Sequence, residues 1–395
     1  MKLLIISHTP HYRRGSQVVG WGPTVRELDY LAILFAEVVH VAPLHDEEAP
    51  ASALAYQSVR IRHAPVRASE GLVAGALAVP GYIGAILKEL SSADVWHVRC
   101  PSGISLIAAV LMAAVPGVRR RWIKYAGNWQ PSSVESLSYG FQRYWLSTGW
   151  HRSRVTVNGD WKDQPGFIHS FTNPSLTDEE LLEGQRAAGE KRLEGSVRLL
   201  FVGRLEEAKG ASRAIDIAQQ LHSTGTKVLL DMVGDGPERM RFEAQAARAG
   251  FGSEVRFHGW LPRTGLAPLY TNAHFVLLPT TSSEGWPKVL SEGMAYGCVP
   301  LAGNVSCISA FLKEFQTGKA LEATDVHAFV CAISEYKMVP ETWAQESTNA
   351  VAAAYRFGYT YYLEAVRRLL NLPWRAETRA ARVMRTQGSL SGLQE

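Results

Sequence analysis

Short apolar runs alternate with stretches of helical periodicity through the second half of the chain. The runs predict five strands, at Val197–Val202, Lys227–Val233, Glu254–His258, Phe275–Leu278 and Cys298–Leu301. The stretches between them predict four helices, over Ala211–His222, Pro237–Ala249, Thr264–Thr271 and Lys288–Tyr296. Apolar strands separated by helices are typical of a parallel sheet that is covered on both faces. This half therefore predicts a doubly wound α/β domain.

The first half follows the same plan without sharing the sequence, with an apolar run, a glycine-containing loop and a helix. Because 395 residues exceed one ordinary core, we predict two Rossmann-like domains that face each other across a cleft. The predicted divisions are a first domain over 1–172, a polar linker over 173–196, a second domain over 197–354, a C-terminal helix at about 355–372 that packs back on the first domain, and a mobile basic tail over 373–395.

Composition narrows the class of protein. The net charge of +4 suits phosphorylated small molecules or an anionic membrane surface, and it is too small to indicate nucleic-acid binding. Four cysteines without a C-x-x-C pair predict neither disulfides nor zinc, and the first apolar run is too short for a signal peptide. We therefore expect a cytoplasmic protein, with peripheral contact at the inner face of the cell membrane left open.

An almost wholly apolar stretch covers Gly71–Leu87, with Pro80 and four glycines inside it. It is at the short limit for a membrane span, which needs about 20 residues. We expect a pair of helices here, either buried or lying on the surface.

The segment FVGRLEEAKG follows the first strand of the second half. The strand ends at Gly203, and Arg204 and Lys209 lie in the loop before the next helix. The N-terminus of a helix presents free N–H groups and partial positive charge, so two added cations there favour a diphosphate. The alternative is that both cations are surface charges paired with Glu206 and Glu207.

The segment VGDGP, at 233–237, is a tight turn before the next helix. An ordinary turn between a strand and a helix is the simpler explanation, so this segment is supporting evidence only. It does not match G-x-G-x-x-G, so it gives no support to a nicotinamide or flavin enzyme.

The third segment, SSEGWPKVLSEGMAYGCVP, holds two carboxylates. Glu284 lies in the loop and Glu292 lies eight residues later, inside the predicted helix. Carboxylates accept hydrogen bonds from vicinal hydroxyls, and the N–H groups of Gly285, Trp286 and Lys288 are suited to phosphates or a sugar. For this pair alone, an acidic helix cap and a solvated glutamate remain the simpler explanation.

Together and in this order, the three segments closely resemble the retaining glycosyltransferases of the GT-B fold, specifically the large family four. The hallmarks of that family are a G-R-L-x-x-x-K-G loop, a G-x-G-P turn, and two glutamates separated by seven residues before an E-A-M-A-like helix. This chain has GRLEEAKG at 203–210, GDGP at 234–237, and Glu284 with Glu292. The similarity extends from about Val197 to Ala302 and is diffuse before that.

The resemblance implies a role for each motif residue. Arg204 and Lys209 would hold the diphosphate of a UDP- or GDP-sugar donor and stabilise the leaving nucleotide. Glu292 would bind the ribose and Glu284 the transferred sugar, while the turn at Gly259–Trp260 would contact the base. No metal and no cofactor are expected, because the two cations neutralise the diphosphate.

The resemblance also implies retention at the anomeric carbon and a hydroxyl acceptor, either a bacterial glycan or a lipid-linked one. Two alternatives stay open: a nucleotide-sugar epimerase on the same fold, and a catalytically silent paralogue that binds nucleotide-sugar. One departure matters, since the family loop usually reads E-G-F-G-x-P and this chain has EGWPKV. Lys288 thereby becomes an additional candidate contact for a phosphate or carboxylate.

The first half offers weaker candidates. Gly22 opens a helix, and its backbone either approaches the diphosphate across the cleft or starts a plain helix. His8, His97 and Asn128 follow predicted strands and are candidates for the acceptor site. A single histidine is more often structural than catalytic.

Overall fold

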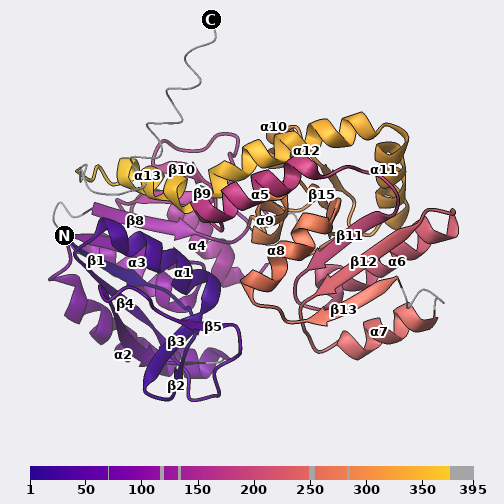
Figure 1. Ribbon diagram of the computed structural model, residues 1–395. Helices are drawn as coiled ribbons and strands as arrows, with labels where there is room; N and C mark the ends of the chain where they lie inside the picture. Colours follow the sequence, from indigo (N-terminus) through magenta and orange to yellow (C-terminus); the bar gives the residue numbers. More distant parts are fainter. Residues whose placement is uncertain (70, 116–119, 132–134, 249–253, 283–284, 374–395) are drawn as a thin grey trace, which may run out of the picture.

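The computed structural model describes residues 1–69, 71–115, 120–131, 135–248, 254–282 and 285–373. They form two α/β domains that lie side by side (Figure 1). The first contains a ten-stranded sheet in the order β10-β9-β8-β7-β1-β4-β2-β3-β5, with β6 also paired to β4. Its strands are β1 (Lys2–Ile6), β2 (His11–Arg14), β3 (Gln17–Trp21), β4 (Glu37–Leu44), β5 (Ala53–Ala55), β6 (Ile61–Arg67), β7 (Val95–Cys100), β8 (Arg120–Tyr125), β9 (Arg154–Asn158) and β10 (Ile168–Phe171).

Helices cover both faces of this first sheet. They are α1 (Gly22–Leu31) with η1 (Ala32–Leu34), α2 (Gly71–Leu90), α3 (Gly103–Ala114) and α4 (Leu137–Ser147). Alternate strand residues point to opposite faces. Leu4 and Ile6 pack in one core with α2, α3 and α4. Leu3 and Ile5 pack in the other core with α1 and the C-terminal helix α13 (Tyr359–Leu369).

The second domain has a six-stranded parallel sheet in the order β13-β12-β11-β14-β15-β16. Its strands are β11 (Val197–Val202), β12 (Val228–Val233), β13 (Val255–Gly259), β14 (Phe275–Leu278), β15 (Val299–Gly303) and β16 (Lys319–Leu321). The helices are α5 (Asp178–Glu190), η2 (Glu207–Lys209), α6 (Ala211–Ser223), α7 (Arg239–Arg248), α8 (Arg263–Asn272), α9 (Lys288–Ala295), α10 (Ile308–Phe315), α11 (Val326–Met338), α12 (Pro340–Ala354) and η3 (Tyr355–Phe357). The predicted pair of doubly wound sheets is therefore confirmed.

The segment between the two sheets contains α5, a regular helix. Thr177 accepts a hydrogen bond from the N–H of Glu180 at its N-terminus, and the Glu180 side chain accepts one from the N–H of Thr177. This capping box satisfies two of the helix's unpaired N–H groups. Helix α5 contacts α8, α9 and α12, so it belongs with the second domain.

The chain returns to the first domain at its C-terminal end. Helix α13 contacts α1, and Tyr362, Val366 and Leu369 pack in the same core as Leu3 and Ile5. The tail beyond residue 373, predicted to be mobile and basic, lies outside the described residues.

The apolar stretch at 71–87 differs from its prediction. It forms one continuous helix, α2, with Pro80 inside it, rather than a pair of helices. Among the described residues, α2 is the one helix that is long and apolar enough to cross a bilayer, judged by length and composition alone. Its segment Val73–Leu90 has a mean hydropathy of 1.4, and 22% of that segment is buried.

Candidate active site

The loop between β11 and α6 carries the first motif. Arg204 is 66% exposed, and its Nε donates to Glu206 Oε1 at 2.8 Å. Lys209 ends the short helix η2, and α6 begins two residues later without a side-chain cap at Gly210. Exposed positive charge beside an uncapped helix N-terminus suits an anionic ligand. The predicted alternative is also present in part, since Arg204 is paired with Glu206.

Glycines let three loops pass close to one another at this edge of the sheet. A Cβ on Gly210 would lie 2.2 Å from the carbonyl oxygen of Pro279, and the φ of Gly210 is +86°. A Cβ on Gly234 would lie 1.9 Å from the carbonyl oxygen of Gly203. No side chain fits at either position. The glycines of the first two motifs thus bring the loops after β11, β12 and β14 together at the carboxyl ends of their strands.

The loop before α9 reaches the first domain. A Cβ on Gly285 would lie 2.4 Å from Asn158 Nδ2 and 2.5 Å from the carbonyl oxygen of Ala126. These two residues follow or end β8 and β9, so the loop contacts the carboxyl edge of the other sheet. Glu284, the predicted contact to the transferred sugar, lies outside the described residues.

The side chain of Trp286 belongs to the core of the second domain. It is 3% exposed, stacks on Phe357 with ring centroids 4.9 Å apart, and meets Phe311 edge-on at 5.1 Å. Only its backbone N–H is therefore left for the predicted contact with the donor. Packing of this indole anchors the loop that follows Glu284.

Lys288 connects α9 to the start of α1 in the first domain. Its Nζ donates to the carbonyl oxygen of Pro23 at 3.4 Å. Burial lowers the pKa of Lys288 to about 8, and the nearby carboxylate of Glu27 opposes this shift. Lys288, which the sequence predicts as an additional contact for a phosphate or carboxylate, therefore lies where the two domains meet.

Glu292 is held at both carboxylate oxygens. Its Oε1 accepts from Arg263 Nη1 at 2.6 Å and its Oε2 accepts from the Tyr270 hydroxyl at 3.1 Å. Arg263 also donates to both oxygens of Glu180, with Nη2 at 3.1 Å from Oε2. Glu180 in turn accepts from Arg26 of α1 at 2.9 Å. A chain of ion pairs thus runs from the first domain to Glu292.

A cavity of about 360 Å³ lies beside this chain of ion pairs, between the two domains. Arg26 and Leu54 line it from the first domain, and Arg263, Tyr270 and Glu292 line it from the second. A cavity at a domain junction, with an apolar wall and a few polar groups, is typical of a small-molecule site. It places Glu292, the predicted ribose contact, on the wall of an interdomain cavity.

The remaining predicted donor contacts lie at strand ends. Trp260 follows β13 and is 48% exposed, and Gly259 has a φ of +69°. A Cβ on Gly22 would lie 2.7 Å from the carbonyl oxygen of Ser52. Packing against Ser52 therefore explains why position 22 is glycine, whether or not its backbone contacts a ligand.

Of the predicted acceptor residues, His8 lies two residues beyond β1, with its ring partly open to solvent and partly covered by the surrounding chain. Desolvation and then the charge of Arg99 lower the pKa of His8. Asn128 is buried, and its Oδ1 accepts from the N–H of Gln130 at 3.2 Å, which holds the loop after β8.

The prediction for His97 was wrong in its placement. The strand β7 continues to Cys100, so His97 lies in the middle of the strand instead of at its end. Its ring is fully buried and stacks on Trp122 with centroids 3.7 Å apart. The residue from this strand that does reach the carboxyl edge is Arg99.

A cluster of buried charged residues lies at the carboxyl edge of the first sheet, and no sequence motif predicted it. Glu27 accepts from Arg99 at 2.7 and 3.1 Å, from Lys124 at 2.8 Å and from the Tyr362 hydroxyl at 2.9 Å. Burial alone would raise the pKa of Glu27, but the charges of Arg99 and Lys124 hold that pKa well below its usual range. The cluster ties α1, β7, β8 and α13 together beneath the domain junction.

A comparison with protein families matches residues 186–350 to the family described as glycosyl transferases group 1. The matched range contains all three motifs of the second domain. This match covers less than half of the 395 residues. The chain is 27% identical over 230 residues to D-inositol 3-phosphate glycosyltransferase of Kribbella flavida. The aligned region covers 55% of this chain and 53% of that protein. In three curated relatives, this one included, the region that matches the chain spans between 24% and 53% of the relative's own length.

Solved structures extend the likeness to both domains. Sucrose-phosphate synthase from Thermosynechococcus elongatus has a TM-score of 0.69 at 17% identity, over 93% of this chain and 98% of that one. HepE of Anabaena in complex with UDP has a TM-score of 0.66 at 15% identity, over 94% and 100%. These neighbours are GT-B glycosyltransferases, so the predicted GT-B fold is confirmed.

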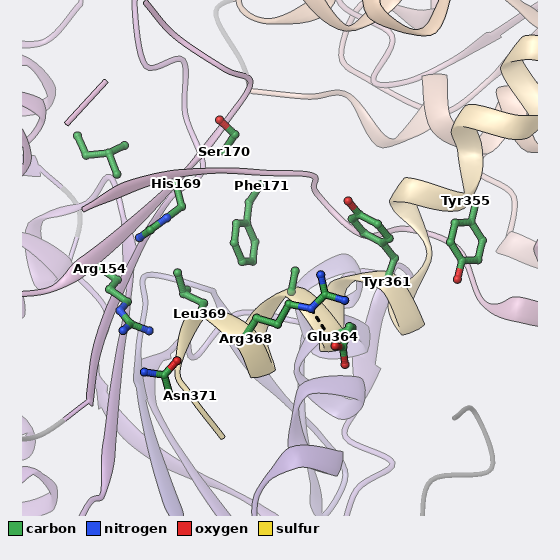
Figure 2. Close-up of a pocket in the computed structure, with 12 residues that line it drawn as sticks. Arg154, His169, Ser170, Phe171, Tyr355, Tyr361, Glu364, Arg368, Leu369 and Asn371 are labelled. Carbon is green, nitrogen blue, oxygen red and sulfur yellow. Dashed lines mark hydrogen bonds and ion pairs between the residues drawn. The ribbon is translucent and has the colours of Figure 1, made fainter. Parts of the chain in front are cut away.

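A larger cavity, of about 850 Å³, lies away from the glycosyl transferases group 1 motifs. Figure 2 shows it between the edge strand β10 and α13, with Arg154, His169 and Arg368 among its lining side chains. Arg368 Nε donates to Glu364 Oε1 at 2.9 Å. None of the residues predicted from the motifs lines this cavity. The smaller cavity beside Glu292 is therefore the candidate for the donor.

Proposed function

We propose that this protein transfers a glycosyl unit from a UDP- or GDP-sugar to a hydroxyl acceptor, with retention at the anomeric carbon. The observation that carries this proposal is the meeting of the three motif loops at one strand edge, with Glu292 on the wall of the interdomain cavity. HepE, which shares the fold, has been solved with UDP and with UDP-glucose. That supports a nucleotide-diphosphate-sugar as the donor.

The proposed roles follow from charge and position. Arg204 and Lys209 neutralise the diphosphate as the bond from the anomeric carbon to its oxygen breaks. Glu292 accepts hydrogen bonds from the ribose hydroxyls, and Glu284 contacts the transferred sugar. The acceptor hydroxyl approaches from the first domain, where His8 lies at the carboxyl end of β1.

A thermal-shift panel of UDP, GDP, ADP and their sugars tests the donor class. A ligand present at 100 times its dissociation constant stabilises the folded state by about 2.7 kcal/mol. The preferred nucleotide and its sugar should both raise the melting temperature. No shift with any of them would contradict the proposal. With the donor known, NMR of the product's anomeric proton reports retention or inversion.

Two other activities remain as alternatives on the same fold. An epimerase would change the donor sugar or release nucleotide without glycosylating an acceptor, whereas a silent paralogue would bind donor without turnover. Chromatography of the donor and acceptor after incubation separates all three. The presence of Arg204, Lys209 and Glu292 favours catalysis over silent binding.

We also propose that turnover needs no divalent metal and that the protein works in the cytoplasm on a glycan or lipid-linked acceptor. Two cations already serve the leaving diphosphate, which is the role that a magnesium ion takes in metal-dependent transfer. Activity in excess EDTA should equal the activity in magnesium or manganese. Loss of turnover in EDTA that added metal restores would contradict this.

A further inference from the structure

One wall of the larger cavity, of about 850 Å³, is a single stripe of helix α13. The stripe consists of residues at helical spacing: Tyr361, Glu364, Ala365 and Arg368. Residues three or four positions apart share one side of a helix. Another side of α13 packs in the core of the first domain through Tyr362 and Val366. The helix thus turns its polar and aromatic stripe toward the cavity (Figure 2).

The register of β9 and β10 forms the second wall. Thr156 of β9 pairs with His169 of β10. Alternate residues of a strand point to the same face of the sheet. Arg154 therefore lies on the same face as His169 and Phe171, and all three line the cavity (Figure 2). Because β10 is the last strand of the sheet, the cavity lies at the sheet's edge.

The cavity carries more positive than negative charge. Glu364 accepts from Arg367 at 2.8 Å and from Arg368 at 2.9 Å, so its carboxylate is already neutralised. Among the described residues, the guanidinium of Arg154 has no hydrogen-bond or ion-pair partner, and the same holds for the ring nitrogens of His169. A guanidinium is always charged, and its fork of donors matches a carboxylate or a phosphate. The cavity therefore suits a ligand with an anionic group.

Exposed aromatic rings favour a saccharide among the anionic ligands. Tyr355 and Tyr361 line the cavity, are 42% and 36% exposed, and have ring centroids 6.1 Å apart. Each ring offers an apolar face to the C–H groups of a sugar and a hydroxyl to its oxygens. Small-molecule sites measure about 300–1,000 Å³, so this cavity has room for more than one sugar ring. An added peptide strand fits less well, because β10 has four residues and short edge strands are poor templates for pairing.

We propose that this cavity binds an acidic oligosaccharide, with its anionic groups on Arg154 and Arg368 and its rings on Tyr355 and Tyr361. No residue among those described lines both this cavity and the one beside Glu292. The site is therefore separate from the proposed donor site, and it can be tested without donor or acceptor.

Calorimetry with the full chain tests the proposal with tetragalacturonate as the probe. The neutral comparison is maltotetraose, which has the same number of rings, and the small acidic comparison is galacturonate. Tetraglutamate carries the same carboxylates on a peptide. The variant Arg154→Gln with Arg368→Gln removes both cations, and Glu364 keeps Arg367 as its partner. The matched control is Arg186→Gln with Arg241→Gln, which removes two exposed arginines of the second domain.

Wild type and the control should bind tetragalacturonate equally, whereas the Arg154/Arg368 variant should lose at least about tenfold in affinity, because charge-assisted hydrogen bonds are removed. The basic tail is the same in all of these proteins, so the loss would belong to the cavity. Tyr361→Ala should also weaken binding, although the charge is unchanged. Glu292→Gln should bind the tetrasaccharide like wild type, which keeps this test independent of the donor site.

Four results would each overturn the proposal. They are absence of binding by wild type, wild-type affinity in the Arg154/Arg368 variant, maltotetraose or galacturonate binding as tightly as tetragalacturonate, and equal affinity for tetraglutamate. The last result would assign the cavity to an acidic peptide. Melting temperatures of all variants report whether each one folds.

Discussion

Arg263 donates to Glu292 at 2.6 Å, and the same guanidinium is held on its other side by Glu180. The second oxygen of Glu292 accepts from Tyr270 at 3.1 Å. An ionised carboxylate has about four lone-pair sites, so Glu292 retains acceptors for two ribose hydroxyls. A carboxylate fixed before the ligand arrives costs less to order on binding. Arg263 is thus a positioning residue for the proposed donor site.

We predict that Arg263→Met raises the dissociation constant for the preferred nucleotide by about tenfold, because a charge-assisted hydrogen bond contributes about 1.5–3 kcal/mol. Arg263→Lys should lose less, since it keeps a charge near Glu292. Calorimetry with free nucleotide measures both variants, and their melting temperatures report on folding. Unchanged binding by the Met variant would remove the positioning role of Arg263, and tighter binding would show that Arg263 competes with the ribose for Glu292.

Arg204→Ala and Lys209→Ala should weaken binding of the nucleoside diphosphate far more than binding of the nucleoside. Each substitution removes a cation aimed at phosphate and leaves the contacts to base and ribose in place. Calorimetry with UDP against uridine, or with the matching guanine pair, makes the comparison. Equal losses for the two ligands would remove the phosphate role from these residues.

The second sheet was predictable because its strands are apolar on both faces. The predicted bounds of β11 and β14 agree with the structure, and those of β12, β13 and β15 differ by one or two residues. Strand β16 was missed, since three half-buried residues carry no such pattern. Helix α5 was placed in a linker although Thr177 and Glu180 have the spacing of a capping box.

The site was predictable only where its residues are close in sequence. Arg204, Lys209 and Glu292 belong to local motifs, and their strand–loop–helix setting follows from the chain order. Arg263 and Glu292 are 29 residues apart, and Glu27 is 335 residues from Tyr362. Contacts of this kind are made by the fold, so no periodicity in the sequence could pair them.

Stability should fall in mild acid because of a histidine cluster in the first domain, in which His11 is buried and His63 is half-buried. His11 and His63 stack with ring centroids 4.2 Å apart, and His11 bonds to the Tyr56 hydroxyl at 2.8 Å. Burial lowers the pKa of His11 to about 3 and that of His63 to about 4. In the unfolded chain both titrate near 6.5. Below that pH the unfolded chain binds more protons, so the free energy of unfolding decreases as the pH falls toward 4.

His63→Gln tests this dependence, since glutamine can still donate to the carbonyl oxygen of Ala42, which His63 contacts at 3.1 Å. The slope of the free energy of unfolding between pH 6 and 5 should decrease by up to about 1.4 kcal/mol per pH unit, the effect of one proton. Urea denaturation at several pH values gives the slope for each protein. Parallel slopes for wild type and variant would show that the fold does not hold the His63 ring in its neutral form.

The two motif glutamates should separate into a binding role and a rate role. Glu292 lines the interdomain cavity, so Glu292→Gln should raise the dissociation constants of both free nucleotide and donor. Glu284→Gln should spare nucleotide binding and lower turnover, because a carboxylate beside the transferred sugar stabilises positive charge that develops in the transition state. Contacts that are equal in the ground and transition states affect binding, whereas contacts stronger in the transition state affect rate. Nucleotide titration of both variants, with turnover at saturating donor, decides the matter. If Glu284→Gln loses nucleotide affinity as strongly as Glu292→Gln, the assigned roles are wrong.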